Sequence, residues 1–377
     1  MDATASGSRR RATLHIQIGR ANAGVLRRLH GWTLLIIIVI IIVVLGACPR
    51  TGVAQFLDNT NPWPRFLLAA QLAIVVNIDS PASVELGNYY QRARKIPSRN
   101  VVRVRIPGSP RGLSAPAFAE LKQQIDAQLD SSIQAIVLIW TAPYAVECNS
   151  ITSALTLGFQ ADLCAPTCKP SRVNPYFDSD SLLPFKDYGL RLTMLLPTES
   201  VELGKALIDR GVQSDGTSPR GSAYFLKTSD TMRSSRARFF PPSGHLAHPS
   251  LELVTLSADS IENRQDVMFY FTGAAHVPKL ETLKFLPGAV ADHLTSTGGD
   301  LLGGAQMSSL RWLEAGATAS YGTVSEPCNY WQKFPNPEVF LNHYLSGESV
   351  IAAYWKSVMW PAQGLFIGEP LAAPYRQ

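Results

Sequence analysis

Short, nearly continuous apolar runs alternate with amphipathic segments along most of the chain. The run QLAIVVNID (71–79) has the length and composition of a strand that is covered on both faces. The segment 80–97 opens on Ser-Pro and places apolar residues at i, i+4 and i+7, which predicts a helix. The next apolar run, VVRVRI (101–106), completes a β–α–β unit, and such a unit holds its two strands parallel.

The same alternation predicts one α/β domain over residues 71–377, built on a mostly parallel, doubly wound sheet. Residues 49–70 are expected to be a linker. The segment TESVELGKALIDRG predicts a helix that begins at Thr198 and ends at Gly211. Strands of the sheet are expected at 72–78, 101–106, 135–140, 267–271, 289–294 and 317–321. The segments 190–197 and 222–230 also have the pattern of strands.

Two stretches interrupt this rhythm. Residues 141–190 hold three cysteines among many Pro, Asn and Asp residues, and they predict a long ordered insertion pinned by disulfides. Residues 233–250, RSSRARFFPPSGHLAHPS, predict an exposed loop. Its two histidines, His245 and His248, have no acidic or cysteine partner nearby and are expected to lie on the surface.

The N-terminus has the pattern of an export signal. Six arginines precede the uncharged run WTLLIIIVIIIVVLGAC (32–48). The length of that run lies between that of a signal h-region and that of a full membrane span of about 20 residues. An uncleaved membrane anchor is therefore the alternative. Its last four residues resemble a lipobox, which would make Cys48 a lipidated N-terminus, whereas ordinary cleavage nearby is the other interpretation. Residues 1–48 are therefore predicted to direct the body to the periplasm or cell envelope of a bacterium.

The net charge of +5 comes from this N-terminal arm. Residues 1–47 hold six of the 34 basic and one of the 29 acidic residues, which leaves 28 of each in the body. A neutral body lacks the excess of cations that binding to a phosphate backbone requires. We therefore expect no nucleic-acid partner.

Four cysteines remain in the body, and an even number in an exported chain favours disulfides. Three pairings are open; we favour Cys164 with Cys168, which leaves Cys148 for Cys328. The sequence CAPTC is a weaker candidate for a metal pair, because the flanking segment has no histidine and no second close cysteine pair. No metal and no cofactor are predicted.

Ligands of open parallel sheets bind outside the carboxyl ends of the strands. Acidic residues expected near those ends form a candidate binding rim, although each also has a structural interpretation as a helix-cap or loop residue: Asp79, Glu147, Asp292 and Glu326.

Candidate catalytic residues follow two neighbouring predicted strands. His276 ends the segment TGAAH, and Thr295 and Ser296 lie in LTSTGG after the next strand. A hydrolase would use His276 as the base and one of the two hydroxyls as the nucleophile, with Asp292 or Glu326 orienting the ring. No G-x-S-x-G elbow surrounds these hydroxyls. We therefore expect the shape of a site without a working nucleophile.

The order of elements resembles the caspase-like fold of gingipain-type cysteine peptidases. The segments TGAAH, GESVIAAYWKS (347–357) and IGEPLAAPY (367–375) carry this resemblance. It implies a catalytic cysteine after the second strand, where this chain has LTSTGG (294–299). A thiol peptidase is therefore not expected.

Longer motifs resemble an uncharacterised bacterial family that occurs with exosortase, a membrane protein-sorting enzyme. They are NYYQRARKIPSRNVVRVRIP, ECNSITSALTLGF, LIDRGVQSDG, SEPCNYWQKFPNPEVF and YWKSVMWPAQGLFIGEPLAAPY. The resemblance implies export and an association with envelope protein sorting. Partners would be envelope or sorted surface proteins, and the membrane through the N-terminal segment or its lipid.

These observations predict a non-catalytic accessory or binding protein, with a hydrolase as the alternative. A third interpretation is a small-ligand or glycan binder that uses Trp331, Trp355 and Trp360, although aromatic residues in that segment are more often part of a core.

Overall fold

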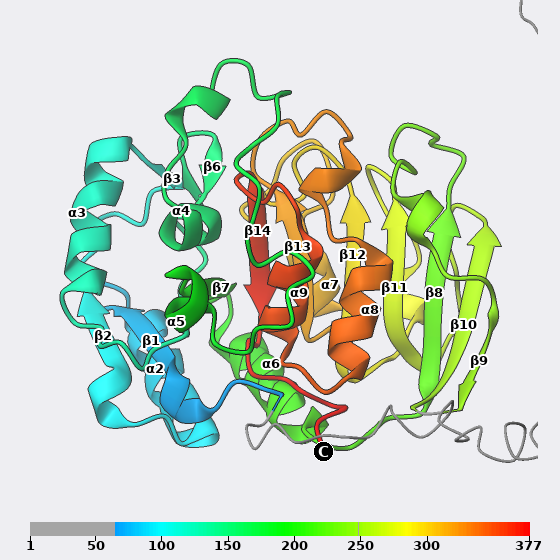
Figure 1. The fold of residues 1–377 in the computed structure, drawn as a ribbon, viewed down its shortest axis with the longest axis horizontal. Coiled ribbons are helices and arrows are strands. Elements are labelled where there is room, and N and C mark those ends of the chain that lie inside the picture. The colour runs from blue at the N-terminus through cyan, green and yellow to red at the C-terminus, as the bar shows by residue number, and fades with distance from the viewer. Residues whose placement is uncertain (1–64, 248) are drawn as a thin grey trace, which may run out of the picture. The chain divides into compact units, whose positions relative to one another are not determined.

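One continuous sheet runs through the computed structural model, which describes residues 65–247 and 249–377 (Figure 1). Its strand order is β2-β1-β4-β7-β14-β13-β12-β11-β8-β10-β9. The strands are β1 (Leu72–Asn77), β2 (Val101–Val104), β4 (Ala135–Ile139), β7 (Leu192–Leu196), β8 (Gly221–Lys227), β9 (Gly244–Ala247), β10 (Ser250–Ser257), β11 (Val267–Gly273), β12 (Phe285–Leu294), β13 (Ala319–Thr323) and β14 (Gly364–Gly368).

Most neighbouring strands are parallel, which confirms the predicted α/β class. Antiparallel ladders join β14 to β13 and β9 to β10. The C-terminal strand β14 lies in the interior of the sheet, where a single bridge from Ile367 to Leu195 connects it to β7. The sequence analysis predicted no strand there.

Helices cover both faces of the sheet, as the continuous apolar strands require. Figure 1 shows α8 and α9 in front of the sheet and α6 and α7 behind it. The helices are α2 (Pro81–Arg94), α3 (Ala115–Asp126), α4 (Ile151–Leu157), α5 (Pro184–Tyr188), α6 (Val201–Ser214), α7 (Leu310–Glu314), α8 (Pro337–Leu345) and α9 (Val350–Ser357).

Helix starts follow their side-chain caps. Ser80 accepts a hydrogen bond from the backbone N–H of Ser83, and Ser114 caps α3 in the same way. The prediction for α6 is wrong at both ends. Ser200, not Thr198, caps the helix, and the helix continues past Gly211 to Ser214. Gly211 instead lies where a Cβ atom would overlap with the side chain of Glu369, so a close contact explains this glycine.

The predicted insertion is ordered and held by two disulfides. It contains α4, α5 and two short strands, β5 (Ala145–Val146) and β6 (Asn149–Ser150), which pair with each other and, through β5, with β3 (Gly112–Leu113). Full pairing of the four cysteines is confirmed, but the favoured connectivity is wrong.

The disulfides join Cys148 to Cys164 and Cys168 to Cys328. The side chain of Asn149 explains the first pair, because it bonds both the backbone N–H and the carbonyl of Gln160, each at 3.1 Å. A short 3-10 helix, Ala161–Leu163, then brings Cys164 back to Cys148.

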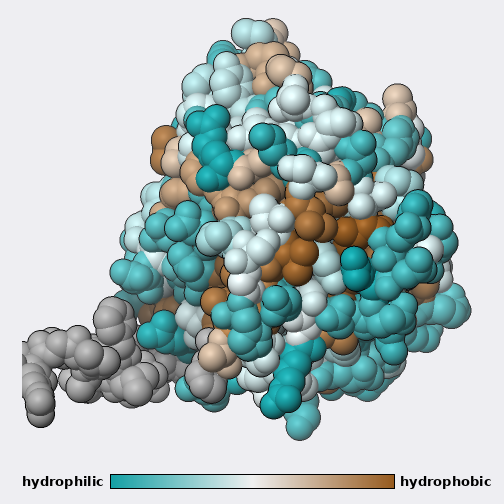
Figure 2. Space-filling view, turned by 90° about the vertical axis from the view of Figure 1, so that its right-hand side faces the viewer, coloured by the Kyte–Doolittle hydropathy of each residue, from teal (hydrophilic) through white to brown (hydrophobic). Residues whose placement is uncertain are grey.

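The segment 233–250 is more than the exposed loop that we expected. It contains the buried Arg236 and the edge strand β9, and β10 begins at its last residue, Ser250. His245 lies exposed in β9, where Nδ1 is 3.2 Å from a carboxylate oxygen of Glu252, and His248 lies outside the described residues. Figure 2 shows this end of the molecule, where apolar surface gathers at the centre of the face and hydrophilic residues surround it.

Residues 1–64 also lie outside the described part, so the predicted export signal or anchor, Cys48 and most of the linker are untested. Where the described chain begins, Leu67 is buried and its N–H donates to the hydroxyl of Ser349. No helix among the described residues is long and apolar enough to cross a membrane.

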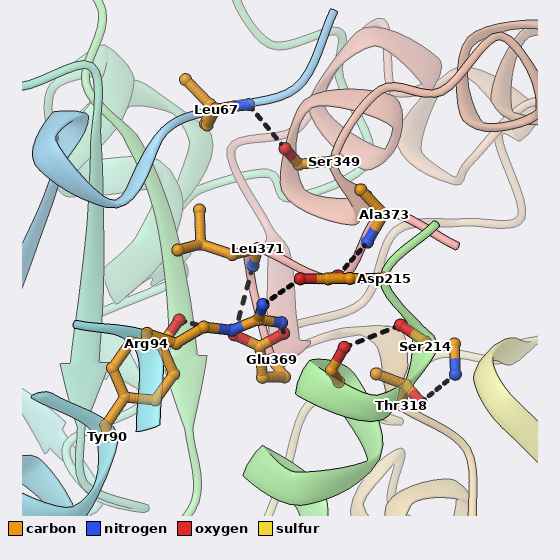
Figure 3. A network of polar contacts seen from close by, with 12 residues as sticks. Leu67, Tyr90, Arg94, Ser214, Asp215, Thr318, Ser349, Glu369, Leu371 and Ala373 are labelled. Carbon is orange, nitrogen blue, oxygen red and sulfur yellow. Dashed lines mark hydrogen bonds and ion pairs between the residues drawn. The ribbon is translucent and has the colours of Figure 1, made fainter. Parts of the chain in front are cut away.

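A buried polar network joins α2, α6 and the C-terminal segment (Figure 3). The guanidinium of Arg94 forms ion pairs with Glu369 and Asp215. Tyr90 donates to Glu369 at 2.6 Å, and Asp215 accepts from the N–H of Ala373 at 3.1 Å. Three segments that are distant in the sequence therefore meet at the buried Arg94.

Candidate functional site

Strands β11 and β12 are parallel neighbours, with Gly273 paired to Leu294 at their carboxyl ends. The segments that follow them, TGAAH and LTST, therefore start from the same edge of the sheet. The structure thus places His276 and Thr295 after adjacent strands, as expected. A role of either residue in catalysis stays a prediction.

The ring of His276 is exposed, and its Nε2 lies 3.1 Å from the carbonyl oxygen of Ala305. Because a carbonyl oxygen only accepts, Nε2 carries the proton in this contact. Within the described residues no carboxylate forms a hydrogen bond or ion pair with this ring. The ring therefore lacks the orienting third group of a catalytic relay.

Thr295 is fully buried and its hydroxyl is engaged on both sides. It donates to the side-chain oxygen of Gln306 at 2.7 Å and accepts from Nε of Arg233 at 3.2 Å. Ser296 is 8% exposed, and its carbonyl accepts from the Thr323 hydroxyl at 3.0 Å. No hydrogen bond links either hydroxyl to His276 among the contacts of the described chain.

Residues Ala305–Met307, which we call the strap, pass across this edge. The backbone N–H of Met307 donates to Ala275 at 2.9 Å, and its carbonyl lies 3.0 Å from Nε2 of His293. The Gln306 side-chain oxygen also accepts from the N–H of Thr297 at 3.0 Å. The strap therefore contacts the residues that follow β11, the end of β12 and the residues beyond it.

His293, which the sequence analysis did not single out, is the buried histidine of this region. Its Nδ1 accepts from the indole N–H of Trp312 at 2.9 Å, so the ring is neutral with its proton on Nε2. Burial lowers the pKa of His293 to about 3. A histidine in the apolar strand GAVADHL was the signal for a buried structural ring. It does not serve as a base, because its free nitrogen is already bonded.

The structure does not bring Asp292 to His276. Asp292 forms a fully buried ion pair with Arg236, which also donates to the carbonyl of Thr272 at 2.8 Å. Burial raises the pKa of the Asp292 carboxyl against the opposing effect of Arg236. Neighbouring side chains in a strand point to opposite faces, so Asp292 lies on the face away from His293.

Each remaining rim carboxylate has a local partner. Asp79 pairs with Arg105 at 2.5 Å. Glu147 accepts from the N–H of Ala115 at 3.3 Å, at the start of α3. Glu326 accepts from the N–H of Cys328 at 2.6 Å. The acidic residues of the predicted rim therefore each bond a different neighbour and do not form one common site.

A hydrogen bond that we did not predict joins the residues that follow β4 to those that follow β12. The hydroxyl of Tyr144, which follows β4, donates to Asp300, which follows β12, at 2.6 Å. Burial, with Asp300 as the next contribution, raises the pKa of Tyr144 to about 12. The contact holds the start of the insertion against the loop that leads to the strap.

The three tryptophans of the alternative binding site differ. Trp355 is fully buried and stacks on Phe366 at 4.2 Å between ring centroids, so it belongs to the core. Trp331 packs on Phe239, and Trp360 on Tyr330.

Among the described residues, no group of three or more His, Cys, Asp or Glu side chains is placed to bind a metal ion.

No protein-family model and no curated protein matches this chain. Two solved structures are similar to it. One is described as a protease, with 11% identity, 84% of this chain and 81% of that chain covered, and a TM-score of 0.44. The other is the complex of Porphyromonas gingivalis RgpB pro- and mature domains, with 10% identity, 81% and 80% covered, and a TM-score of 0.40. The likeness is too distant to assign a role to any residue.

Proposed function

We propose that this protein is a non-catalytic binding protein of the cell envelope. One observation carries the proposal. The two groups that would form a hydrolase site, His276 and Thr295, both direct their protons to the strap, to the carbonyl of Ala305 and the side-chain oxygen of Gln306.

The chemistry of these contacts opposes nucleophilic attack. A hydroxyl becomes a nucleophile when a neighbouring base takes its proton, and an amide oxygen is too weak a base for that step. Arg233 also donates to the hydroxyl oxygen of Thr295, so one of its two lone pairs is already bonded. The edge is therefore suited to holding a partner rather than to cleaving one.

Two disulfides support an oxidising compartment, because such bonds persist in exported proteins and are rare in the cytosol. Export through residues 1–48 places the body in the periplasm or envelope. We propose envelope or sorted surface proteins as partners, in an exosortase-type sorting system. This part of the proposal rests on the sequence resemblance. Nucleic acid is not among the proposed partners, since the body is neutral.

The test is a broad panel of peptide and ester substrates incubated with the purified full chain. We expect no turnover above the blank for the wild type, for His276→Ala or for the double variant Thr295→Ala/Ser296→Ala. Thermal unfolding of each variant serves as the control for folding. Turnover by the wild type that disappears in both variants would establish a hydrolase instead.

A hydrolase held closed by its strap is the second candidate, because Gly273 and Leu294 do place the two segments side by side. The variant Gln306→Ala distinguishes the two proposals, since it releases the Thr295 hydroxyl. A binding protein stays inactive after this change. A closed hydrolase gains turnover that depends on His276, as shown by its loss in the Gln306→Ala/His276→Ala double variant.

A further inference from the structure

The largest imbalance of charge in the body lies in one short stretch. Residues 86–111 contain seven arginine and lysine residues and no acidic residue. The remainder of residues 48–377 carries 21 basic and 28 acidic residues. A body that is neutral as a whole is therefore locally cationic at one place and acidic on average elsewhere.

Four of these cations are exposed and none of the four forms an ion pair within the described part of the chain: Arg92, Lys95, Arg99 and Arg103. We call them the basic corner. Arg94, Arg105 and Arg111, by contrast, are paired with Glu369, Asp79 and Asp300. The corner comprises the last turn of α2, the residues after it and the edge strand β2.

Hydrogen bonds hold the corner in one conformation. The amide of Gln91 donates to the carbonyl of Ile96 and to the hydroxyl of Ser98. Asn100 donates to the carbonyl of Leu72, at the start of β1, at 3.0 Å. Asp130 is an acidic group near Arg99, and its carboxylate is already bonded by Ser132. The backbone that carries the cations is therefore held in place, and their exposed side chains are available to an external anion.

The basic corner does not present a free sheet edge to which a peptide strand could add. The side chain of Gln128 accepts from the backbone N–H of Arg103 and donates to its carbonyl, at 3.3 and 3.2 Å. Gln124 accepts from the N–H of Arg105. Residues of α3 and of the turn after it thus occupy the main-chain groups that a peptide strand would need.

The entry point of the chain argues for a membrane. The Asn100 amide also bonds the carbonyl of Ala70 at 2.9 Å, so the chain passes beside Arg99 soon after the described part begins. The apolar run 32–48 precedes the first described residue by the sixteen residues 49–64. On length alone, sixteen residues reach at most about 55 Å. If the chain is attached to a membrane at that run, as a span or through Cys48, the start of the described domain stays within this reach of the bilayer.

From these observations we infer that the basic corner binds the headgroups of anionic lipids. A cation near an anionic leaflet strengthens association by about fivefold, and the effect decays within a Debye length. Four cations without an ion-pair partner in the described chain would give the domain a preferred face toward the membrane. This inference does not depend on the proposed absence of catalysis.

The experiment reconstitutes the full chain into nanodiscs of phosphatidylcholine alone or with phosphatidylglycerol. Hydrogen–deuterium exchange is measured over residues 92–105. We expect exchange of the exposed amides to slow severalfold in the anionic discs only. The protection should disappear in 1 M salt, where the Debye length is about 3 Å. It should also disappear in the variant Arg99→Glu/Arg103→Glu.

The matched control is Lys227→Glu/Arg238→Glu, which reverses two exposed cations near the other end of the sheet. This variant should keep the lipid-dependent protection, and both variants should unfold at the wild-type temperature. Equal exchange rates in the two kinds of disc overturn the inference. It is also overturned if the control variant loses the protection as fully as Arg99→Glu/Arg103→Glu does. Protection by soluble heparin without any response to anionic lipid would also overturn it, in favour of a polyanion site.

Discussion

Trp312 donates its indole N–H to Nδ1 of His293 across 2.9 Å in the interior of the protein. This contact fixes the ring as a neutral acceptor. In the unfolded chain the same imidazole takes up a proton near pH 6.5, whereas burial lowers its pKa in the folded protein to about 3. Acid therefore favours the unfolded state.

The pH dependence of stability follows from this difference. Between these two pKa values the unfolded chain binds the extra proton, so the free energy of unfolding falls as the pH decreases, by up to about 1.4 kcal/mol per pH unit. The stability that depends on a neutral His293 ring is fully present above pH 6.5 and is lost as the pH falls toward 3. From pH 7 to pH 5 the expected loss from this one residue is about 2 kcal/mol.

Urea unfolding of His293→Asn at both pH values checks this prediction. The variant is expected to be less stable at pH 7 but to lose less on acidification, so the gap to the wild type narrows. The same substitution at the exposed His276 is the control. Parallel pH profiles for wild type and His293→Asn would contradict the assignment.

The cation at the centre of Figure 3 should be costly to remove. Arg94→Met leaves the buried Glu369 without its ion-pair partner, while Asp215 keeps only its contact with Arg376, and we expect the change to destabilise the fold by about 3–5 kcal/mol. The comparison is Lys205→Met, which removes an exposed pair with Glu85 and should cost less than about 1 kcal/mol. Denaturant midpoints measure both, and equal losses would show that the network adds little.

The two disulfides should contribute unequally. They join residues 16 and 160 positions apart, and in the chain-entropy model a longer closed loop gives the larger stabilisation, about 3 against about 5 kcal/mol. Cys168→Ser/Cys328→Ser should therefore be less stable than Cys148→Ser/Cys164→Ser. Peptide mapping without reduction gives the connectivity directly, and a Cys164–Cys168 peptide would refute the arrangement described above.

Glycine is required at the carboxyl end of β11. A Cβ atom at Gly273 would overlap with the carbonyl of Arg233, a backbone atom that cannot move aside as a flexible side chain can. Gly273→Ala is expected to cost about 2 kcal/mol or more. At Gly244 nothing lies within 4 Å of such an atom, so Gly244→Ala should be nearly neutral. Thermal unfolding of the pair tests the contact that positions Arg233 beside Thr295.

Much of the sheet could be predicted because its strands are apolar over their whole length. The runs at β1, β4 and β11 are buried at every position, as their continuous apolar pattern predicts. β14 was missed because GLFIG is short and bounded by glycines. Those glycines have a packing reason that only the fold shows, since a Cβ at Gly364 would overlap with the ring of Tyr321.

The site was harder to predict for a different reason. Parallel crossovers were enough to place His276 and Thr295 after neighbouring strands. The contact of Thr295 with Gln306 depends instead on the path of a loop, and no periodicity encodes that path. Arg236 was overlooked because it lies in a stretch of Arg, Ser and Pro that is typical of surface, although its partner Asp292 is buried in β12. A lone carboxylate inside an apolar strand was the available signal for a buried cation.

The position of β14 has a consequence for biogenesis. This strand comes from the end of the chain, yet β7 and β13 lie on either side of it. A polypeptide that crosses a membrane from its N-terminus delivers those two neighbours well before the strand that joins them. Two incomplete half-sheets therefore wait, with unpaired inner edges, until translocation is almost finished. Long-range pairing of this kind is slow and leaves aggregation-prone edges exposed. If the chain is exported as proposed, we expect it to cross the membrane unfolded and to need protection on the far side until β14 emerges.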